Sequence, residues 1–204
     1  MNDNSRQVRV DTFLNWPCGL TGASLAGGFL ALILATHGEL AWAAGVVIVC
    51  GILDSFDGLL ARRLSVSSPF GEQLDSLADI IAFGVTPALM LYVALDSTQV
   101  VGAATGVVFV LCGAWRLARF ALLEERHRFF LGLPIPPAGC IMASVAALQL
   151  PAPVAVAITL VLSVLMISDL PFPTFGTIGR LLRRNRSVEE EPALVSPVDL
   201  DRAA

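Results

Sequence analysis

The sequence contains no lysine, and all thirteen of its basic residues are arginines. We attribute this absence to a bias in composition, because nothing else in the sequence gives it a chemical role. Charge is scarce as well: charged residues make up 15% of the 204 residues, 55% are hydrophobic, and the mean hydropathy is +0.75. Soluble domains carry a larger charged share. The composition therefore excludes an ordinary soluble domain and predicts an all-α, polytopic membrane protein.

Cysteine is rare and shows no ligand spacing. Neither of the two histidines, His37 and His127, completes a zinc site with a cysteine. We expect the cysteines to be small buried side chains; they are Cys18, Cys50, Cys112 and Cys140. We also expect no signal peptide, because residues 1–11 are polar and no convincing cleavage site follows the first apolar stretch.

Six apolar stretches are predicted to form transmembrane helices within a domain spanning residues 19–175. They cover approximately residues 19–36, 40–53, 80–95, 99–120, 138–150 and 154–170. Residues 1–18 form a polar N-terminus, in which Thr12–Cys18 fits either an interfacial helix or the lead-in of the first span. Residues 176–204 are rich in arginine and then acidic, which predicts a disordered tail. Pro87 should kink the third helix and leave a carbonyl for neighbouring helices to satisfy.

The arginines predict the orientation of these helices. All thirteen lie in the N-terminus or in the stretches associated with the ends of the second, fourth and sixth helices, and none follows the first, third or fifth. Arginine concentrates on the cytoplasmic side of membrane proteins. We therefore expect a cytoplasmic-membrane protein with both termini, and a polar cavity between the helices, facing the cytoplasm.

Four aspartates interrupt the apolar sequence where the second stretch ends and before the third begins. They are Asp54, Asp57, Asp75 and Asp79. One acidic side chain in the bilayer costs about 3 kcal/mol, so four would cost about 10 kcal/mol. The 14 residues before Asp54 and the 16 after Asp79 rise about 21 and 24 Å, both short of the hydrocarbon thickness of about 30 Å. The carboxylates should therefore lie at similar depths, just inside the membrane, and need a compensating cation.

Helical spacing groups the same aspartates into two stripes. On one helix Asp54 and Asp57 share a face with Gly58 and Ala61, and on the next Asp75 and Asp79 lie at i and i+4. Two antiparallel helices with these stripes facing each other would surround a small volume with four carboxylates. Such oxygen ligands suit Mg²⁺ or Mn²⁺, and the nest is large enough for two ions about 4 Å apart.

The stretch from Asp54 to Asp79 reads Asp-x2-Asp-Gly-x2-Ala-Arg-x8-Gly-x3-Asp-x3-Asp. In this pattern the chain resembles the CDP-alcohol phosphotransferases at every fixed position. The resemblance implies an enzyme that transfers the phosphatidyl group of a CDP-linked lipid to an alcohol and releases CMP. It implies that Asp54, Asp57 and Asp75 are the main metal ligands. It also implies that Asp79 is the general base and contacts the second metal as well, with a role as a metal ligand alone as the alternative.

The same resemblance implies a binding site for the CDP group. The residues that match the family's positions are Asp54, Gly58, Ala61, Arg62 and Gly71. Arg62 suits a pyrophosphate, whereas the neighbouring Arg63 is explained by topology alone. The two glycines would let a nucleotide approach the backbone closely.

Further stretches resemble the phosphatidylserine synthases, which use L-serine as the acceptor. They are 15–19, 83–89, 116–120, 132–138 and 168–175. Arg116 or Arg119 could bind the serine carboxylate, although both also fit topology or headgroup-phosphate binding. Ala121 replaces the asparagine usual in those enzymes, and Gly176 replaces a lysine. These departures weaken the assignment of serine as the acceptor and leave the assignment to the phosphotransferases intact. Small-residue helix faces and the resemblance both favour a homodimer.

Other functions remain as alternatives. A sister enzyme would use glycerol 3-phosphate or an inositol phosphate and would need more basic residues at the cavity. A divalent-cation transporter would need a polar path through both leaflets, and the outer halves of the second and third helices offer none. A catalytically silent subunit is disfavoured by the intact motif.

Overall fold

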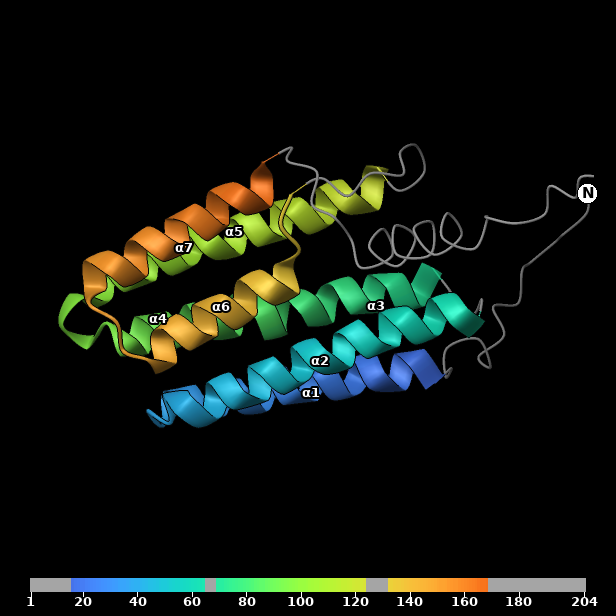
Figure 1. The fold of residues 1–204 in the computed structure, drawn as a ribbon, viewed down its shortest axis with the longest axis horizontal. Helices are drawn as coiled ribbons and strands as arrows, with labels where there is room; N and C mark the ends of the chain where they lie inside the picture. Colours follow the sequence, from blue (N-terminus) through green and yellow to red (C-terminus); the bar gives the residue numbers. More distant parts are fainter. Residues whose placement is uncertain (1–15, 65–68, 124–131, 169–204) are drawn as a thin grey trace, which may run out of the picture.

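The computed structural model describes residues 16–64, 69–123 and 132–168, and every regular element in these ranges is helical (Figure 1). The elements are α1 (Trp16–Thr36), α2 (Leu40–Leu64), α3 (Pro69–Asp79), η2 (Ile80–Val85), α4 (Thr86–Ala94), η3 (Asp96–Thr98), α5 (Gln99–Leu123), α6 (Ile135–Ala147) and α7 (Ala152–Ile167). The segment η2 is a π-helical turn and η3 is a 3-10 turn. The all-α prediction is therefore confirmed for the described part of the chain.

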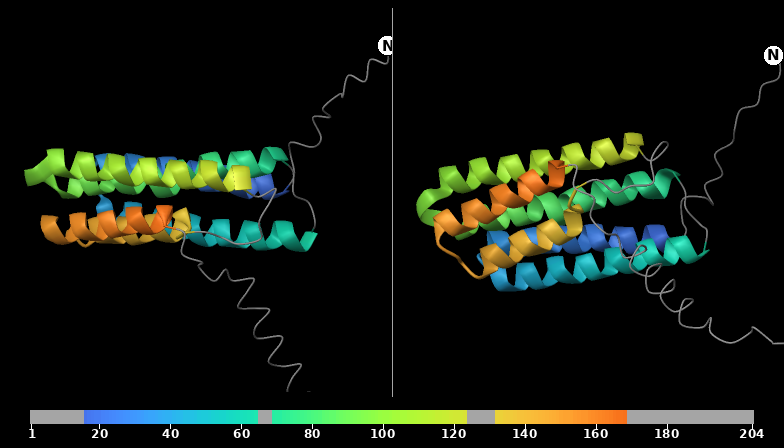
Figure 2. Two further views of the ribbon diagram at one scale, coloured as in Figure 1. Left: turned by 90° about the horizontal axis from the view of Figure 1, so that it is seen from above. Right: turned by 45° about the horizontal axis from the view of Figure 1, so that its top comes forward.

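The helices run along one long axis and form two layers (Figure 2). One layer contains α1, the continuous rod α3–η2–α4, and α5, whereas the other contains α2, α6 and α7. Across the layers α1 packs on α2, α4 on α6, and α5 on α7. The connections α1–α2, α4–α5 and α6–α7 lie together at one end of the bundle, here called the connection end (Figure 1). The C-terminal part of α2 and the N-terminal part of α3 extend toward the opposite end (Figure 1).

The centre of the bundle is packed around η2. Phe83 of η2 is fully buried, as are Met90 of α4 and Phe109 of α5. Two glycines bring neighbouring backbones against η2: a Cβ added at Gly28 of α1 would lie 2.8 Å from the Cα atom of Ala82, and one at Gly139 of α6 would collide with Phe83. Small residues at helix contacts permit such close approach in membrane proteins. The turn η2 is therefore held from two sides.

The outer surface carries large apolar side chains. Val100 is 83% exposed, Trp42 71% and Trp115 70%. Among the described residues, three helical segments are long and apolar enough to cross a membrane: Gly19–Thr36, Phe70–Ala94 and Gln99–Ala121. Three apolar helical segments are shorter: Leu40–Phe56, Ile135–Ala147 and Ala152–Ile167. An apolar exterior of this kind is suited to lipid, so the chain is a membrane protein, and each of the six predicted stretches contains a helix where the structure describes it.

The third helix begins at Pro69, so the acidic stretch before residue 80 is helical, as the spacing of Asp75 and Asp79 predicts. The ends of the last two helices differ from the prediction. Prolines explain the starts of α6 and α7: Pro136, Pro137 and Pro153 lie inside their first turns, where a missing N–H leaves no intrahelical bond unmade. Both helices also end early, since Gln149 has a positive φ of 48° and Ser168 is extended. Residues 12–15, 124–131 and 169–204 lie outside the described ranges.

The cysteines only partly match their prediction. Cys50 is buried, whereas Cys112 and Cys140 are partly buried. The thiol of Cys50 lies 3.6 Å from the carbonyl oxygen of Ser24, a distance at which a thiol donates a weak hydrogen bond. All three are free thiols, and the side chain of Cys18 is not described. The thiol of Cys140 likewise lies 3.9 Å from the carbonyl oxygen of Val47, so Cys50 and Cys140 are packing residues that contact the backbone of neighbouring helices.

Candidate metal centre

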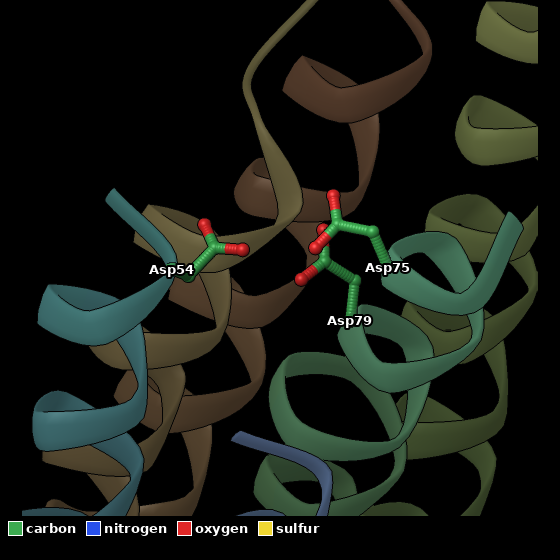
Figure 3. A group of neighbouring side chains, drawn as sticks. All are labelled: Asp54, Asp75 and Asp79. Carbon is green, nitrogen blue, oxygen red and sulfur yellow. The ribbon is translucent and has the colours of Figure 1, made fainter. Parts of the chain in front are cut away.

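Three carboxylates from two helices converge between the layers. Asp54 projects from α2, while Asp75 and Asp79 project from successive turns of α3 (Figure 3). One oxygen atom from each of the three lies within 4.8 Å of the others. The i, i+4 spacing places Asp75 and Asp79 on one face of α3, and α2 and α3 both pack against α1, which brings that face near Asp54. We call these three residues the aspartate cluster.

The aspartate cluster is shielded from solvent and strongly negative. Asp79 is 9% exposed, and Asp54 and Asp75 are intermediate in burial. The three carboxylates repel one another, because the charges of Asp54 and Asp75 both act on Asp79. In the part of the chain that the structure describes, the opposing charge on Asp79 comes from Arg116 of α5. One guanidinium does not balance three carboxylates, so the site favours an additional cation.

The arrangement fits a divalent ion bound by oxygen. Metal–oxygen distances for Mg²⁺ and Ca²⁺ are about 2.0–2.6 Å, so ligands on opposite sides of one ion lie about 4–5 Å apart. The separation of at most 4.8 Å between cluster oxygens falls within this range. No other group of three or more His, Cys, Asp or Glu side chains in the described ranges meets the same criterion. The structure therefore singles out these three aspartates as metal-binding candidates.

The remaining residues of the first acidic stripe lie on α2. This helix continues without interruption from Leu40 to Leu64, so Asp57, Gly58, Ala61 and Arg62 occupy helical positions one and two turns beyond Asp54. The side chains of these four residues are not described. Helical spacing places Asp57 on the same face as Asp54. Its assignment as a ligand, and the assignment of the other three to CDP, stay predictions.

Gly71 occupies the first turns of α3. It is partly buried and lies four residues before Asp75, so it belongs to the face of α3 that carries the aspartates. This position agrees with a role beside the cluster, and the assignment of Gly71 to CDP stays a prediction. Glu72, the next residue, lies three residues before Asp75 on the same side of α3 and is exposed near the start of the helix.

The two arginines of α5 differ in their surroundings. The Nε atom of Arg116 is buried and has no hydrogen-bond partner, and its charge attracts Asp79. Arg119, one turn further, donates a hydrogen bond from Nη1 to the carbonyl oxygen of Ile167, 3.4 Å away at the end of α7. Arg116 thus belongs to the surroundings of the cluster, and Arg119 at least partly links two helices.

Sequence reasoning missed the π-helical turn that begins directly after Asp79. The Thr86 hydroxyl at its end is fully buried and lies 2.9 Å from the carbonyl oxygen of Ile81 and 3.1 Å from that of Gly28. The available signal was Pro87, which removes an N–H from the helix and clashes with the preceding turn. A kink was expected there, and the structure shows a π-helical turn before Pro87, in which the hydrogen bond spans five residues rather than four.

Comparison with known proteins gives a consistent result. The family model described as CDP-alcohol phosphatidyltransferase matches residues 14–171, which include all four predicted aspartates. Archaetidylserine synthase from Methanothermobacter thermautotrophicus is 33% identical over 183 residues, covering 88% of this chain and 76% of that protein. CDP-diacylglycerol–serine O-phosphatidyltransferase from Bacillus subtilis is 34% identical over 160 residues, covering 78% of this chain and 90% of that protein. The protein of that name from Methanocaldococcus jannaschii is 33% identical over 156 residues, covering 76% and 72%.

Proposed function

The chain belongs to the CDP-alcohol phosphatidyltransferase family, and on that premise we propose that it transfers the phosphatidyl group of CDP-diacylglycerol to L-serine. The products are phosphatidylserine and CMP. The observation that carries the proposal is the convergence of Asp54, Asp75 and Asp79 from two helices of a membrane protein. The names of the relatives support serine in particular, because they share this acceptor while differing in the lipid.

The aspartates divide the chemical work. Asp54, Asp57 and Asp75 would hold one or two divalent ions, Mg²⁺ or Mn²⁺. When bound, these ions neutralise the charge on the pyrophosphate oxygens and on the departing CMP. Asp79 accepts the proton of the serine hydroxyl while the new O–P bond forms and the P–O bond to CMP breaks, with the electron pair leaving on the CMP phosphate. The proton then passes to water.

The lipid donor, CDP-diacylglycerol, is bound by residues of α2 and α3. Asp54, Gly58, Ala61, Arg62 and Gly71 would contact the CDP group, with Arg62 paired to the pyrophosphate. An arginine fork matches phosphate oxygens in a bidentate geometry. The absence of a side chain at the two glycines leaves room for the nucleotide beside the backbone. The lipid tails remain in the bilayer against the apolar exterior.

The acceptor is assigned to Arg116 rather than to Arg119. The buried Nε–H of Arg116 has no hydrogen-bond partner in the structure, and a serine carboxylate could supply one. Its attraction to Asp79 also places it beside the proposed base. Arg119 already donates to the carbonyl of Ile167, which makes it less suited to binding a substrate.

The architecture proposed for this reaction has six transmembrane helices in residues 19–175, flanked by a polar N-terminus and a C-terminal tail. The arginine distribution supports cytoplasmic termini and an active site open to the cytoplasm. Serine then reaches the site from water and CMP leaves into water, while CDP-diacylglycerol enters from the bilayer. Small residues on helix faces support a homodimer.

The acceptor can be tested directly with the purified protein, CDP-diacylglycerol and Mg²⁺ or Mn²⁺. The assay measures CMP release with serine, glycerol 3-phosphate or inositol phosphate supplied in parallel. The proposal predicts release with serine, and release only with a phosphorylated acceptor would overturn the serine assignment. Release that persists without any divalent ion would instead count against the role of the aspartate cluster.

A further inference from the structure

We infer that Thr86 is a positioning residue that fixes the direction of Asp75 and Asp79 by locking the π-helical turn η2 against α1. The inference rests on the proposed function, since it concerns the same aspartate cluster. It adds a residue that has no contact with substrate and acts through the backbone. The argument begins with the helix that carries both aspartates.

The rod α3–η2–α4 presents two faces to the bundle interior. Its first part directs Asp75 and Asp79 toward Asp54, and its last part buries Met90 and Leu91. An α-helix turns by about 100° per residue, so one extra residue in a turn rotates everything beyond it by about that angle. If η2 became an ordinary α-helical turn while α4 stayed in place, the aspartates would rotate away from Asp54.

Thr86 makes the contacts that define the turn. Its backbone N–H donates to the carbonyl oxygen of Ile81, five residues earlier, which is the π-helical hydrogen bond. Its hydroxyl lies 2.9 Å from the same oxygen and 3.1 Å from the carbonyl oxygen of Gly28 on α1. A hydroxyl has one hydrogen, so the two carbonyls share it. The residue thereby joins the widened turn to a neighbouring helix.

The surroundings allow little adjustment. Gly28 brings the α1 backbone against Ala82, and Thr86 is 0% exposed. Pro87 follows Thr86 and cannot donate a backbone hydrogen bond, so the turn has few other donors. Without the hydroxyl, two buried carbonyls lose a donor and the turn loses its polar link to α1. We expect the aspartates then to sample directions that do not meet Asp54.

The test compares Thr86→Val with Thr159→Val in the full-length purified protein. Thr159 is also 0% exposed, but its hydroxyl donates to Ala155 within α7. Both changes replace a buried hydroxyl by a methyl group. Binding of Mn²⁺ is measured by electron paramagnetic resonance, and the melting temperature is recorded alongside. We expect Thr86→Val to raise the Kd for Mn²⁺ at least fivefold, with Thr159→Val and the conservative Thr86→Ser within twofold of the wild type.

Equal Mn²⁺ affinity in Thr86→Val and the wild type would overturn the inference alone, whereas a wild-type protein that does not bind Mn²⁺ would remove the proposed function with it. Should Thr86→Val not fold, hydrogen exchange on the wild-type protein decides. Bound Mn²⁺ should slow exchange in Ile80–Thr86 more than in α7, because the cluster and the turn are coupled. Identical exchange with and without Mn²⁺ would contradict that coupling.

Discussion

Two aspartates, Asp79 within the rod α3–η2–α4 and Asp96 just beyond it, have very different surroundings. At the connection end, Asp96 is exposed and accepts a hydrogen bond of 2.9 Å from the side-chain amide of Gln99. Toward the other end, Asp79 is nearly buried and faces the carboxylates of Asp54 and Asp75. Asp96 is satisfied by a neighbouring donor and water, whereas the aspartate cluster requires a cation. A carboxylate's surroundings, more than its presence, therefore indicate its function.

The largest effect is expected when the two carboxylates, Asp79 and Asp96, are neutralised one at a time. Asp79→Asn should lower kcat by about 1,000-fold, because an amide cannot accept the serine proton and is a poorer metal ligand. Asp96→Asn should leave kcat within twofold. Rates of CMP release and circular dichroism of both variants provide the measurement. Comparable rates for Asp79→Asn and the wild type would exclude Asp79 as the base.

The next test sharpens the difference in cation demand. Mn²⁺ at about 100 times its Kd should stabilise the wild-type protein by about 2.7 kcal/mol, because it binds the folded state. Asp54→Asn and Asp75→Asn should lose most of this gain, and Asp96→Asn should retain it. Thermal unfolding in detergent with Mn²⁺ or with a chelator measures the gain. Loss of the gain in Asp96→Asn to the same extent would indicate nonspecific binding.

A third test asks whether the distinction extends to the arginines of α5. Arg116→Gln should raise the KM for serine about tenfold or more, since a hydrogen bond to a charged group contributes about 1.5–3 kcal/mol. Arg119→Gln should mainly lower the melting temperature, because Arg119 links α5 to the end of α7. Steady-state kinetics with serine varied at saturating lipid separates the two. If Arg119→Gln instead raised the KM for serine and Arg116→Gln only lowered the melting temperature, the two assignments would have to be exchanged.

The smallest expected effects concern packing. A Cβ at Gly139 would collide with the backbone of Phe83, so Gly139→Ala should destabilise the protein by about 1–3 kcal/mol. A Cβ at Gly45 of α2 would have no atom within 4 Å, so Gly45→Ala should stabilise the helix by about 0.5–1 kcal/mol. Unfolding of both variants in the same detergent checks the signs. If Gly139→Ala were as stable as Gly45→Ala, α6 would be able to move away from η2 to make room for the added Cβ.

Much of the fold could be predicted from local pattern. Long apolar stretches imply helices in a membrane, and the spacing of Asp75 and Asp79 places both on one helical face without tertiary information. Helix ends were harder where prolines cluster, because Pro136 and Pro137 look like a loop although they suit a first turn. The predicted metal and CDP ligands remain predictions, and for Asp57, Gly58, Ala61 and Arg62 the structure describes only the helix that carries them.

Other features could not be predicted because they arise from contacts between distant segments. Arg116 and Arg119 are equivalent in sequence, and only the position of α7 separates them. Thr86 and Thr159 are equally buried threonines, yet one hydroxyl reaches another helix and the other returns to its own. The π-helical turn lies directly before Pro87 and is in close contact with Gly28 of α1 and Gly139 of α6. Contacts between such distant segments become visible only in the three-dimensional structure.

The most direct measurement is the anomalous scattering of manganese in crystals of the protein grown with Mn²⁺. We expect one or two peaks between α2 and α3, each about 2.0–2.6 Å from carboxylate oxygens of the aspartate cluster. Peaks confined to other sites, or density showing Asp54, Asp75 and Asp79 directed away from one another, would contradict it.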